Sequence, residues 1–345
     1  MERTEIATLG EFGLIKRLTE KFSVRNSSTE KGVGDDAAVL DYKDKKVLIT
    51  TDLLLEGIHF DLTYVPLRHL GYKAAIINFS DIYAMNGQPK QITVSLGVSR
   101  RFSVEDLEEL YAGIRLACNE YEVDLAGGDT SASMTGLTIS ITCVGEGDEG
   151  KIVYRNGAKP NDLICVSGDL GAAYMGLQLL EREKIVFETS PNVQPDFTDR
   201  DYILQRQLKP QARRDIIARL RKHNVLPTAM MDISDGLSSE LFHICTQSNV
   251  GCRIFSDKIP ISEQAAMMAE ELNFDIVTAA LNGGEDYELL FTVALDDYEK
   301  IIGVEGIGLV GHIVPAESGL VLVGRQGEEV ALKAQGWNSL QQEGS

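Results

Sequence analysis

The sequence is poor in the features that mark disulfide-rich, secreted and membrane-spanning proteins. Its five cysteines are odd in number, form no Cys-x-x-Cys pair and lie mostly inside apolar runs, which indicates reduced thiols in a hydrophobic core. No apolar run reaches the ~20 residues of a transmembrane helix, and the first residues lack the apolar segment of a signal peptide. We therefore expect a cytoplasmic protein without disulfide bonds.

Basic residues are also scarce. The chain has 33 lysines and arginines against 52 aspartates and glutamates, which gives a formal net charge of −19. Nucleic acids and anionic membranes need a basic surface, so we expect neither as a partner. Solubility explains most of the acidic excess. A nucleotide is an anion as well, however, and a chain this acidic would need a divalent cation to bind one.

Two common nucleotide-binding signatures are missing or misplaced. The chain has no G-x-x-x-x-G-K-[ST] segment, which excludes a P-loop site. A G-x-G-x-x-G pattern does occur at 306–311, but the residues that follow it, 312–315, are typical of a strand and a turn. A dinucleotide site requires a helix at that point, so that the pyrophosphate meets the helix N-terminus. This glycine pattern therefore carries little weight.

The chain is long enough, at 345 residues, for two domains. Aliphatic and β-branched runs predict strands at 47–51, 92–98, 137–144, 163–167, 288–293 and 320–323. Helical periodicity predicts helices at 67–85, 104–121, 172–183, 202–222, 237–247 and 262–272. These interspersed elements indicate an α/β (α+β) fold. The polar, glycine-rich segment 145–150 is the expected boundary, which divides the chain into domains 1–148 and 149–345.

Aspartates stand at the ends of apolar runs throughout the chain. They are Asp35, Asp36, Asp52, Asp81, Asp129, Asp232 and Asp235. A carboxylate near a hydrophobic core is costly unless it is paired or binds a metal ion, and converging carboxylates raise one another's pKa values. Bound Mg²⁺, which prefers oxygen ligands, would remove that cost. The pattern favours a magnesium site built from aspartates.

Asp81 gives the sharpest form of this pattern. It follows Leu70, Ala74 and Ile77 at successive spacings of four, three and four residues, which places all four side chains on one face of a helix. The carboxylate then points inward from an apolar stripe. A buried cap or a salt bridge explains this position as well as a metal site does.

Three further motifs have both structural and functional interpretations. Ser234 and Asp235 open a helix, where either residue could be an N-cap or could hold phosphate at the helix N-terminus. Asp232, at the end of an apolar run two positions earlier, favours the functional interpretation. The Gly-Gly-acid segments that end in Asp129 and Glu285 are either tight turns or sites where backbone approaches a ligand closely.

Two isolated residues also stand out. His59 lies shortly after Asp52, and a lone histidine is more often structural than catalytic. Trp337 is the only tryptophan and lies in a polar C-terminal segment. It could anchor that segment to the core or stack on a flat or cationic ligand.

Together these segments resemble the thiamine-monophosphate kinase family. The matching pieces, in chain order, are GEFGLIKRL, GVGDDAAVL, TTDLLLEGIHF, NFSDIYAMNG, GGDTSAS, YRNGAKPND, MDISDGLSSEL and NGGEDYELLFTV. They extend from Gly10 to Val293, with Trp337 as a further match. The resemblance implies a two-domain fold like that of aminoimidazole ribonucleotide synthetase, with mixed sheets flanked by helices. In it, 1–148 binds ATP and Mg²⁺ and forms a homodimer, and 149–345 closes the active site.

The resemblance also implies roles for single residues. Positions that match magnesium ligands are Asp36, Thr50, Thr51, Asp52, Asp81, Asp129, Asp232 and Asp235, and the catalytic set is Asp52, Asp81, Asp129 and Asp232. Positions that match ATP contacts are Gly128, Asp129, Arg155 and Ser234, together with Tyr111 or a neighbour in its helix. Positions that match the lining of the thiamine-phosphate site are His59, Glu285 and Trp337.

The implied reaction is the ATP-dependent phosphorylation of thiamine monophosphate to thiamine diphosphate, the last step in the synthesis of thiamine diphosphate. The acceptor phosphate is already an anion at neutral pH, so positioning and charge neutralisation should dominate a direct in-line transfer. Several Mg²⁺ ions and Arg155 would supply positive charge. Glu285 would suit the cationic thiamine, and Trp337 would stack on one of its rings.

Two rival interpretations remain open at this point. One is a sister ATP-dependent synthetase, but selenophosphate synthetase would carry a reactive cysteine or selenocysteine in its N-terminal segment, and the first cysteine here is Cys118. The other is a non-catalytic, acidic metal-binding protein, which would explain the charge and leave the ordered motifs unexplained.

Overall fold

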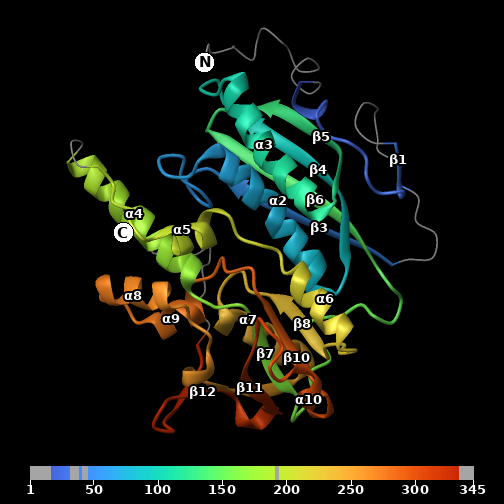
Figure 1. Cartoon of the computed structure of the whole chain (residues 1–345), viewed down its shortest axis with the longest axis vertical. Coiled ribbons are helices and arrows are strands. Elements are labelled where there is room, and N and C mark those ends of the chain that lie inside the picture. Colours follow the sequence, from blue (N-terminus) through green and yellow to red (C-terminus); the bar gives the residue numbers. More distant parts are fainter. Residues whose placement is uncertain (1–16, 32–38, 41–45, 191–193, 334–345) are drawn as a thin grey trace. The chain divides into compact units, whose positions relative to one another are not determined.

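The computed structural model of the chain describes residues 17–31, 39–40, 46–190 and 194–333 (Figure 1). The chain divides into two compact units. Unit 1 comprises Met1–Ile82 and Gly87–Gly150, and unit 2 comprises Tyr83–Asn86 and Lys151–Ser345. Each unit has its own sheet.

Unit 1 is built on a four-stranded sheet. Its strands are β3 (Lys46–Leu55), β4 (Gln88–Val98), β5 (Asp124–Ala132) and β6 (Leu137–Gly147), in the spatial order β3-β6-β4-β5. β6 pairs antiparallel with β3 and β4, and β4 pairs parallel with β5. A separate short ladder joins β1 (Thr29–Lys31) and β2 (Val39–Leu40). β6 alternates buried and half-buried residues along its length, as expected for a sheet with one covered face.

Helices α2 (Leu67–Ala84) and α3 (Val104–Tyr121) lie over this sheet (Figure 1). α3 begins after Ser103, which forms a capping box with Asp106. The two helices approach closely because Gly71 and Gly113 lack side chains. A Cβ at either glycine would collide with the backbone of the other helix.

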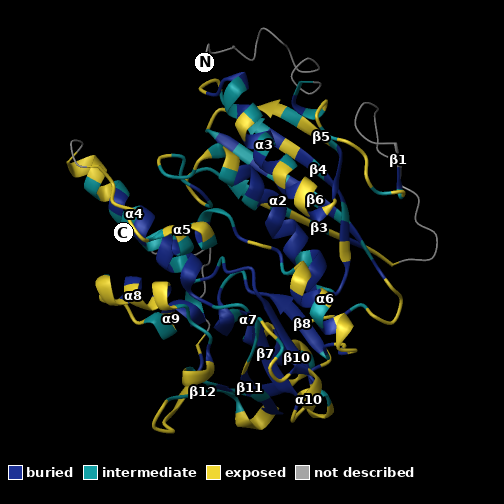
Figure 2. Cartoon of the chain, viewed as in Figure 1, coloured by how far each residue is buried: buried dark blue, intermediate teal, exposed yellow. Residues whose placement is uncertain are grey.

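Unit 2 contains a seven-stranded sheet in the order β13-β12-β9-β11-β7-β10-β8. Its strands are β7 (Leu163–Ser167), β8 (Ala229–Asp232), β9 (Val250–Phe255), β10 (Leu289–Val293), β11 (Ile307–Pro315), β12 (Leu320–Val323) and β13 (Glu329–Ala331). Neighbouring strands pair antiparallel, except that β12 and β9 are parallel. β7, β8 and β10 are buried at every residue (Figure 2), so both faces of this part of the sheet are covered.

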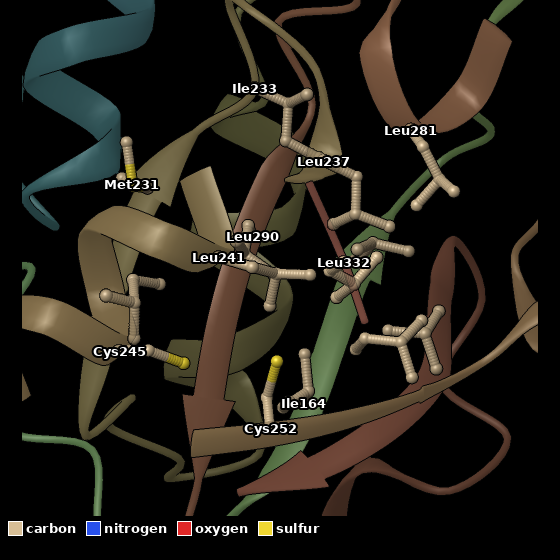
Figure 3. Close-up of a cluster of buried hydrophobic side chains, with 14 of the residues drawn as sticks. Ile164, Met231, Ile233, Leu237, Leu241, Cys245, Cys252, Leu281, Leu290 and Leu332 are labelled. Atoms are coloured by element: carbon tan, nitrogen blue, oxygen red, sulfur yellow. The ribbon is translucent and has the colours of Figure 1, made fainter. Parts of the chain in front are cut away.

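The helices of unit 2 are α4 (Ala172–Thr189), α5 (Asp201–Leu208), α6 (Arg214–Lys222), α7 (Leu237–Ser248), α8 (Glu263–Glu271), α9 (Ile276–Asn282) and α10 (Tyr298–Ile301). Single 3₁₀ turns occur at Ser256–Lys258, Leu295–Asp297 and Ala316–Ser318. The main core of the unit joins α7 to the sheet: Leu237 and Leu241 pack in one cluster with Leu290 and Ile164 (Figure 3). This cluster fixes the position at which α7 starts.

The predicted class, a mixture of helices and strands with mixed sheets flanked by helices, is confirmed. The segment 202–222 was predicted as one helix, and that prediction was wrong. α5 ends at Leu208 and α6 begins at Arg214, because Pro210 between them has no N–H for a helical hydrogen bond. None of the described helices is long and apolar enough to cross a membrane.

Candidate active site

The residues singled out from the sequence are distributed over both units. Unit 1 holds Thr50, Thr51, Asp52, His59, Asp81, Tyr111, Gly128 and Asp129, and unit 2 holds Arg155, Asp232, Ser234, Asp235 and Glu285. Asp36 and Trp337 lie outside the described residues. The described candidates are thus divided between the two units.

In unit 1, the structure brings Asp52 on β3 close to Asp81 on α2. Thr50 and Asp52 are two residues apart on the strand, so their side chains share a face with the buried Leu48. Thr50 Oγ1 donates a hydrogen bond to Oδ2 of Asp81 at 2.5 Å. This bond shows that the half-buried Asp81 side chain faces β3 from α2.

The Asp52 carboxyl is in an unfavourable place for a negative charge. Burial, and then the charge of Asp81, raise the pKa of Asp52 to about 7. Its Oδ2 is buried and has no hydrogen-bond partner among the described residues, although buried polar atoms are nearly always paired. A divalent cation beside Asp52 and Asp81 would supply the missing partner and offset the repulsion. The oxygen ligands of this pair suit Mg²⁺.

The described residues contain no group of three His, Cys, Asp or Glu side chains that could hold one ion. An ion beside Asp52 and Asp81 would therefore need other oxygen ligands as well. Mg²⁺ is commonly bound in this way, through one or two carboxylates together with waters and the phosphate groups of a substrate. Asp52 and Asp81 are two carboxylates of the kind that such a site uses.

The structure does not bring Asp129 to this pair within unit 1. Asp52 lies in the same row of the sheet as Val94 and Gly128. Asp129 lies in the next row, with Ser95, and because residues in one row share a face, its side chain projects from the face opposite that of Asp52. β3 and β5 are also opposite edges of the sheet, roughly 14 Å apart at ~4.8 Å per strand. Within one copy of unit 1, Asp52 and Asp129 therefore lie on opposite edge strands of the sheet.

Thr51 and Gly128 have structural roles in the same sheet. The Thr51 side chain points away from the Asp52–Asp81 pair. Its Oγ1 donates to the Ile141 carbonyl at 3.2 Å and accepts from Thr142 Oγ1 at 3.1 Å. A Cβ at Gly128 would collide with the Val94 carbonyl oxygen, so glycine is needed where β4 and β5 pair. The side chain of Thr51 is thus no ligand of an ion at Asp52.

Tyr111 and His59 have local partners in unit 1. Tyr111 is buried on α3, with its ring edge-to-face against Phe22 at 6.5 Å between centroids, and burial raises the pKa of Tyr111 to about 12. Tyr111 is thus a core residue. His59 accepts a hydrogen bond on Nδ1 from the Leu55 N–H at 3.1 Å, so its Nε2 carries the ring proton.

In unit 2, the segment after β8 folds around the carboxylate of Glu240. The N–H groups of Ser234 and Asp235 both donate to Glu240 Oε1, at 3.3 and 2.9 Å. Glu240 lies in the first turn of α7, and burial is the main cause that raises the pKa of Glu240 to about 7. This residue fixes the turn that carries Asp232, Ser234 and Asp235.

Glu240 was not assigned a role from the sequence. The signal that could have identified it is its position, in the first turn of a helix, because acids there commonly bind backbone N–H groups. The turn it stabilises also holds a mixture of charges. Burial raises the pKa of Asp235, while the charges of His243 and Arg155 oppose that shift. The structure thus brings Arg155 and Asp235 together, an arrangement suited to a metal-bound phosphate.

Glu285 is tied to the same turn. Its N–H donates to the Ser234 carbonyl at 2.7 Å, and the Tyr287 N–H donates to the Ile233 carbonyl at 2.9 Å. Glu285 and Tyr287 have φ angles of 59° and 51°, in the left-handed region that is uncommon for residues other than glycine. Unit 2 therefore places the residue predicted to bind substrate directly beside a residue predicted to bind ATP.

Known proteins match most of the chain. A family model described as AIR synthase related protein, N-terminal domain, matches residues 34–146, and one described as AIR synthase related protein, C-terminal domain, matches 159–334. Thiamine-monophosphate kinase of Aquifex aeolicus (strain VF5) is 37% identical over 302 residues, which cover 88% of this chain and 92% of that protein. Thiamine-monophosphate kinase of Bacillus subtilis (strain 168) is 34% identical over 85% of this chain and 86% of that protein.

The fold is likewise similar to solved structures. The structure of AaThiL complexed with AMPPCP and TMP is 34% identical to this chain, with a TM-score of 0.74 and coverage of 98% of this chain and 99% of that one. The crystal structure of thiamine-monophosphate kinase from Stenotrophomonas maltophilia K279a is 29% identical, with a TM-score of 0.79 over 93% of this chain and 98% of that one.

Proposed function

The chain belongs to the thiamine-monophosphate kinase family, and we propose that it transfers the terminal phosphoryl group of ATP to thiamine monophosphate in a Mg²⁺-dependent reaction. The products are thiamine diphosphate and ADP. A relative that is 34% identical has been solved with AMPPCP, an analogue of ATP, and with TMP, which supports both substrates. The ordered motifs and the family membership argue against a sister synthetase and against a non-catalytic metal-binding protein.

One observation carries the magnesium part of this proposal: Asp52, with a buried oxygen that lacks a described partner, lies beside Asp81. Asp52, Asp81 and Thr50 would hold a magnesium ion there. When bound, Mg²⁺ supplies positive charge to phosphate oxygens. We propose that further magnesium ions are bound by Asp36, Thr51, Asp129, Asp232 and Asp235. Because the Thr51 side chain points away from Asp52, Thr51 would bind an ion near Asp52 through its backbone carbonyl.

The acceptor phosphate is an anion at neutral pH and needs no strong base. We therefore propose direct in-line transfer, in which the residues of the chain hold two phosphates and screen their charges. Arg155 would add fixed positive charge, and Ser234 would hold phosphate from the turn after β8. Gly128 and Asp129 are the ATP contacts that we propose in unit 1. Tyr111 is buried, so its part in the ATP site would be to support the position of α3.

Three residues are proposed to bind thiamine monophosphate. Glu285 would attract its cationic part, because the backbone bond to Ser234 places this carboxylate beside the turn after β8. His59 would donate from Nε2, and Trp337 would stack on a ring of the substrate.

We also propose that the protein is a homodimer formed through unit 1, which the resemblance implies. β3 is an edge strand of the described sheet, and its outer face carries Val47, Ile49 and Leu53, which are 43%, 70% and 52% exposed. Three aliphatic side chains on an exposed edge strand favour a second copy of the chain as their partner. A cytoplasmic location stays a prediction, consistent with five free, buried cysteines.

The test is an assay of the purified chain with ATP, MgCl₂ and thiamine monophosphate. We expect thiamine diphosphate and ADP in equal amounts, and no product when EDTA removes Mg²⁺. ADP formed without thiamine diphosphate, or turnover only with another acceptor, would refute the proposed substrate. Full activity in excess EDTA would refute the magnesium requirement while leaving the substrate assignment intact.

A further inference from the structure

Three acidic residues stand within four positions of the loop that precedes β10. They are Glu285, Asp286 and Glu288. Glu288 accepts hydrogen bonds from Arg206, at 2.7 Å, and from Arg213. Asp286 lies 3.7 Å from Arg206. Burial lowers the pKa of the Arg206 guanidinium, but the neighbouring groups, Glu288 and Asp286 foremost, together raise it by more, so the arginine stays charged. Both arginines therefore pair with Glu288, and Arg206 also lies close to Asp286.

Glu285 has a different kind of donor. Its Oε2 accepts a hydrogen bond from Nε2 of Gln207 at 2.7 Å. Gln207 is only 6% exposed and lies next to Arg206 on α5. An amide donor orients a carboxylate but brings no charge of its own. Gln207 thus holds Glu285 without contributing to the neutralisation of its negative charge.

The backbone at Gly284 and Glu285 has an uncommon conformation that neighbouring groups must hold in place. Glu285 has a φ of 59°, and the preceding Gly284 has a φ of 70°. A Cβ at Gly284 would come within 2.5 Å of the Ser234 carbonyl oxygen, so the loop is pressed against the turn after β8. A residue other than glycine keeps such a backbone conformation only where the surrounding structure holds it.

α5, which carries Gln207, is itself firmly attached to the loops around it. Arg206 donates to the Asp169 carbonyl at 2.9 Å, and Tyr202 donates to the Asp169 carboxylate. These bonds and the bond from Arg206 to Glu288 attach the helix to the loops around it. A donor on a firmly held helix fixes its partner more closely than a donor on a free loop would.

We propose that Gln207 is a positioning residue that holds the Glu285 carboxylate toward the acceptor and so contributes to selection of a phosphate ester with a cationic heteroaromatic group. This inference rests on the proposed function, in which Glu285 binds the cationic part of thiamine monophosphate. Gln207 itself acts through Glu285 and takes no part in the transfer.

The main test is Gln207→Met, which keeps a flexible side chain of similar length and removes the donor. We expect the KM for thiamine monophosphate to rise about ten-fold, since a hydrogen bond to a charged group has that effect or more. The KM for ATP and kcat should change by less than about two-fold. The matched control is Gln205→Met, because Gln205 is an exposed residue of the same helix; it should behave as the wild type.

A double-mutant cycle with Glu285→Gln shows whether Gln207 acts through Glu285. In the Glu285→Gln background, Gln207→Met should have less than about a two-fold further effect on the KM for thiamine monophosphate. A full ten-fold further effect would overturn the positioning role. So would a rise in the KM for both substrates in Gln207→Met alone, which would indicate a general structural role.

If Gln207→Met does not fold, the exchange variant with Gln207→Glu and Glu285→Gln keeps an amide–carboxylate pair and moves the charge onto α5. We expect it to fold and to show a raised KM for thiamine monophosphate only. An unchanged KM would overturn the proposal. A wild-type chain that makes no thiamine diphosphate refutes the proposed function itself, whereas wild-type turnover with an unchanged KM in Gln207→Met refutes only the role of Gln207.

Discussion

Burial and the neighbouring charge of Asp81 make a negative charge on Asp52 costly. Asp52→Asn removes the repulsion at nearly constant volume, so we expect a protein at least as stable as the wild type. We expect kcat to fall at least about 100-fold, because charge stabilisation by a bound metal is worth several kcal/mol. The measurements are kcat at saturating substrates over a range of MgCl₂ concentrations and the thermal unfolding midpoint.

The matched control for this variant is Glu149→Gln. Glu149 is an exposed acid of the same unit, 2.9 Å from Lys46, and exposed ion pairs contribute little. This control should keep kcat within about two-fold. An Asp52→Asn protein with near-normal kcat at ordinary MgCl₂ would show that the magnesium site has been placed at the wrong residues.

Asp286 gives unit 2 a pH-dependent stability. Burial is the main cause that raises the pKa of Asp286 to about 7 in the folded protein, and Arg206 and backbone N–H groups oppose this shift. In the unfolded chain the same carboxyl has a pKa of about 3.9. Its contribution to stability is therefore fully present below pH 4 and is lost as pH rises toward 7. Relative to Asp286→Asn, the wild type should lose up to about 1.4 kcal/mol per pH unit in that window.

Urea unfolding of both proteins at pH 4.5, 6 and 7.5 measures this difference. Asp257→Asn, at an exposed position of unit 2, is the control and should follow the wild type at each pH. Parallel curves for the wild type and Asp286→Asn would mean that the carboxyl is ionised in the folded protein throughout the range.

Among single residues, the sequence could predict contacts only where local geometry decides them. The inward face of Asp81 follows from its helical spacing, and Thr50 and Asp52 share a face because strands repeat every two residues. The separation of Asp129 from Asp52 depends instead on the order β3-β6-β4-β5. That order results from pairing between strands far apart in the chain, and no local pattern contains it.

Among the secondary-structure elements, the break between α5 and α6 shows what one proline does for the site. Arg206 and Arg213 both bind Glu288. In one continuous helix, two residues seven positions apart would be separated by about 10.5 Å along the axis. The interruption at Pro210 lets both reach one carboxylate. Helical periodicity over 202–222 could not reveal this, because the periodic signal continues through the break and only the proline contradicts it.

The crossing of α2 and α3 permits a test at the same scale. Helix propensity alone predicts that Gly113→Ala stabilises α3 by ~1 kcal/mol. A Cβ there would lie 2.7 Å from the backbone nitrogen of Tyr72 and would collide with the Arg68 carbonyl oxygen. Backbone atoms cannot rotate away, and overpacking typically costs ~1–3 kcal/mol. Because the clash is with backbone, we expect a cost near the upper end of that range and so a net loss of about 2 kcal/mol in the free energy of unfolding, measured in urea.

Ala112→Gly, at the neighbouring and half-exposed position of α3, is the control for propensity and should lose about 1 kcal/mol. Stabilisation by Gly113→Ala alongside a normal loss in Ala112→Gly would show that α2 and α3 can separate to admit the methyl group. It would also show that their close approach does not depend on glycine.

For the whole molecule, the resemblance read from the ordered motifs is confirmed by the relatives and the family models, which together match both units. The ordered motifs were informative because each contains residues suited to binding or catalysis. Such a role permits fewer residue types at a position than packing in a hydrophobic core does. The net charge of −19 is a second property of the whole chain. Two copies of such a chain repel each other, so a dimer must gain enough from apolar contact to exceed that repulsion.

Ile49→Lys tests the proposed dimer. Ile49 is 70% exposed at the centre of the apolar face of β3, so a lysine there costs the folded chain little but places a charge in the interface. We expect the wild type to sediment as a dimer, more stable at 0.5 M than at 0.05 M NaCl because salt screens the net charge. Ile49→Lys should sediment as a monomer, and its thermal unfolding midpoint should equal that of the monomeric wild-type chain. The control is Lys46→Ile, at the exposed start of β3, which should remain dimeric. A wild type that is monomeric at every salt concentration, or an Ile49→Lys variant that is as dimeric as the wild type, would show that this face of β3 does not join two copies of the chain.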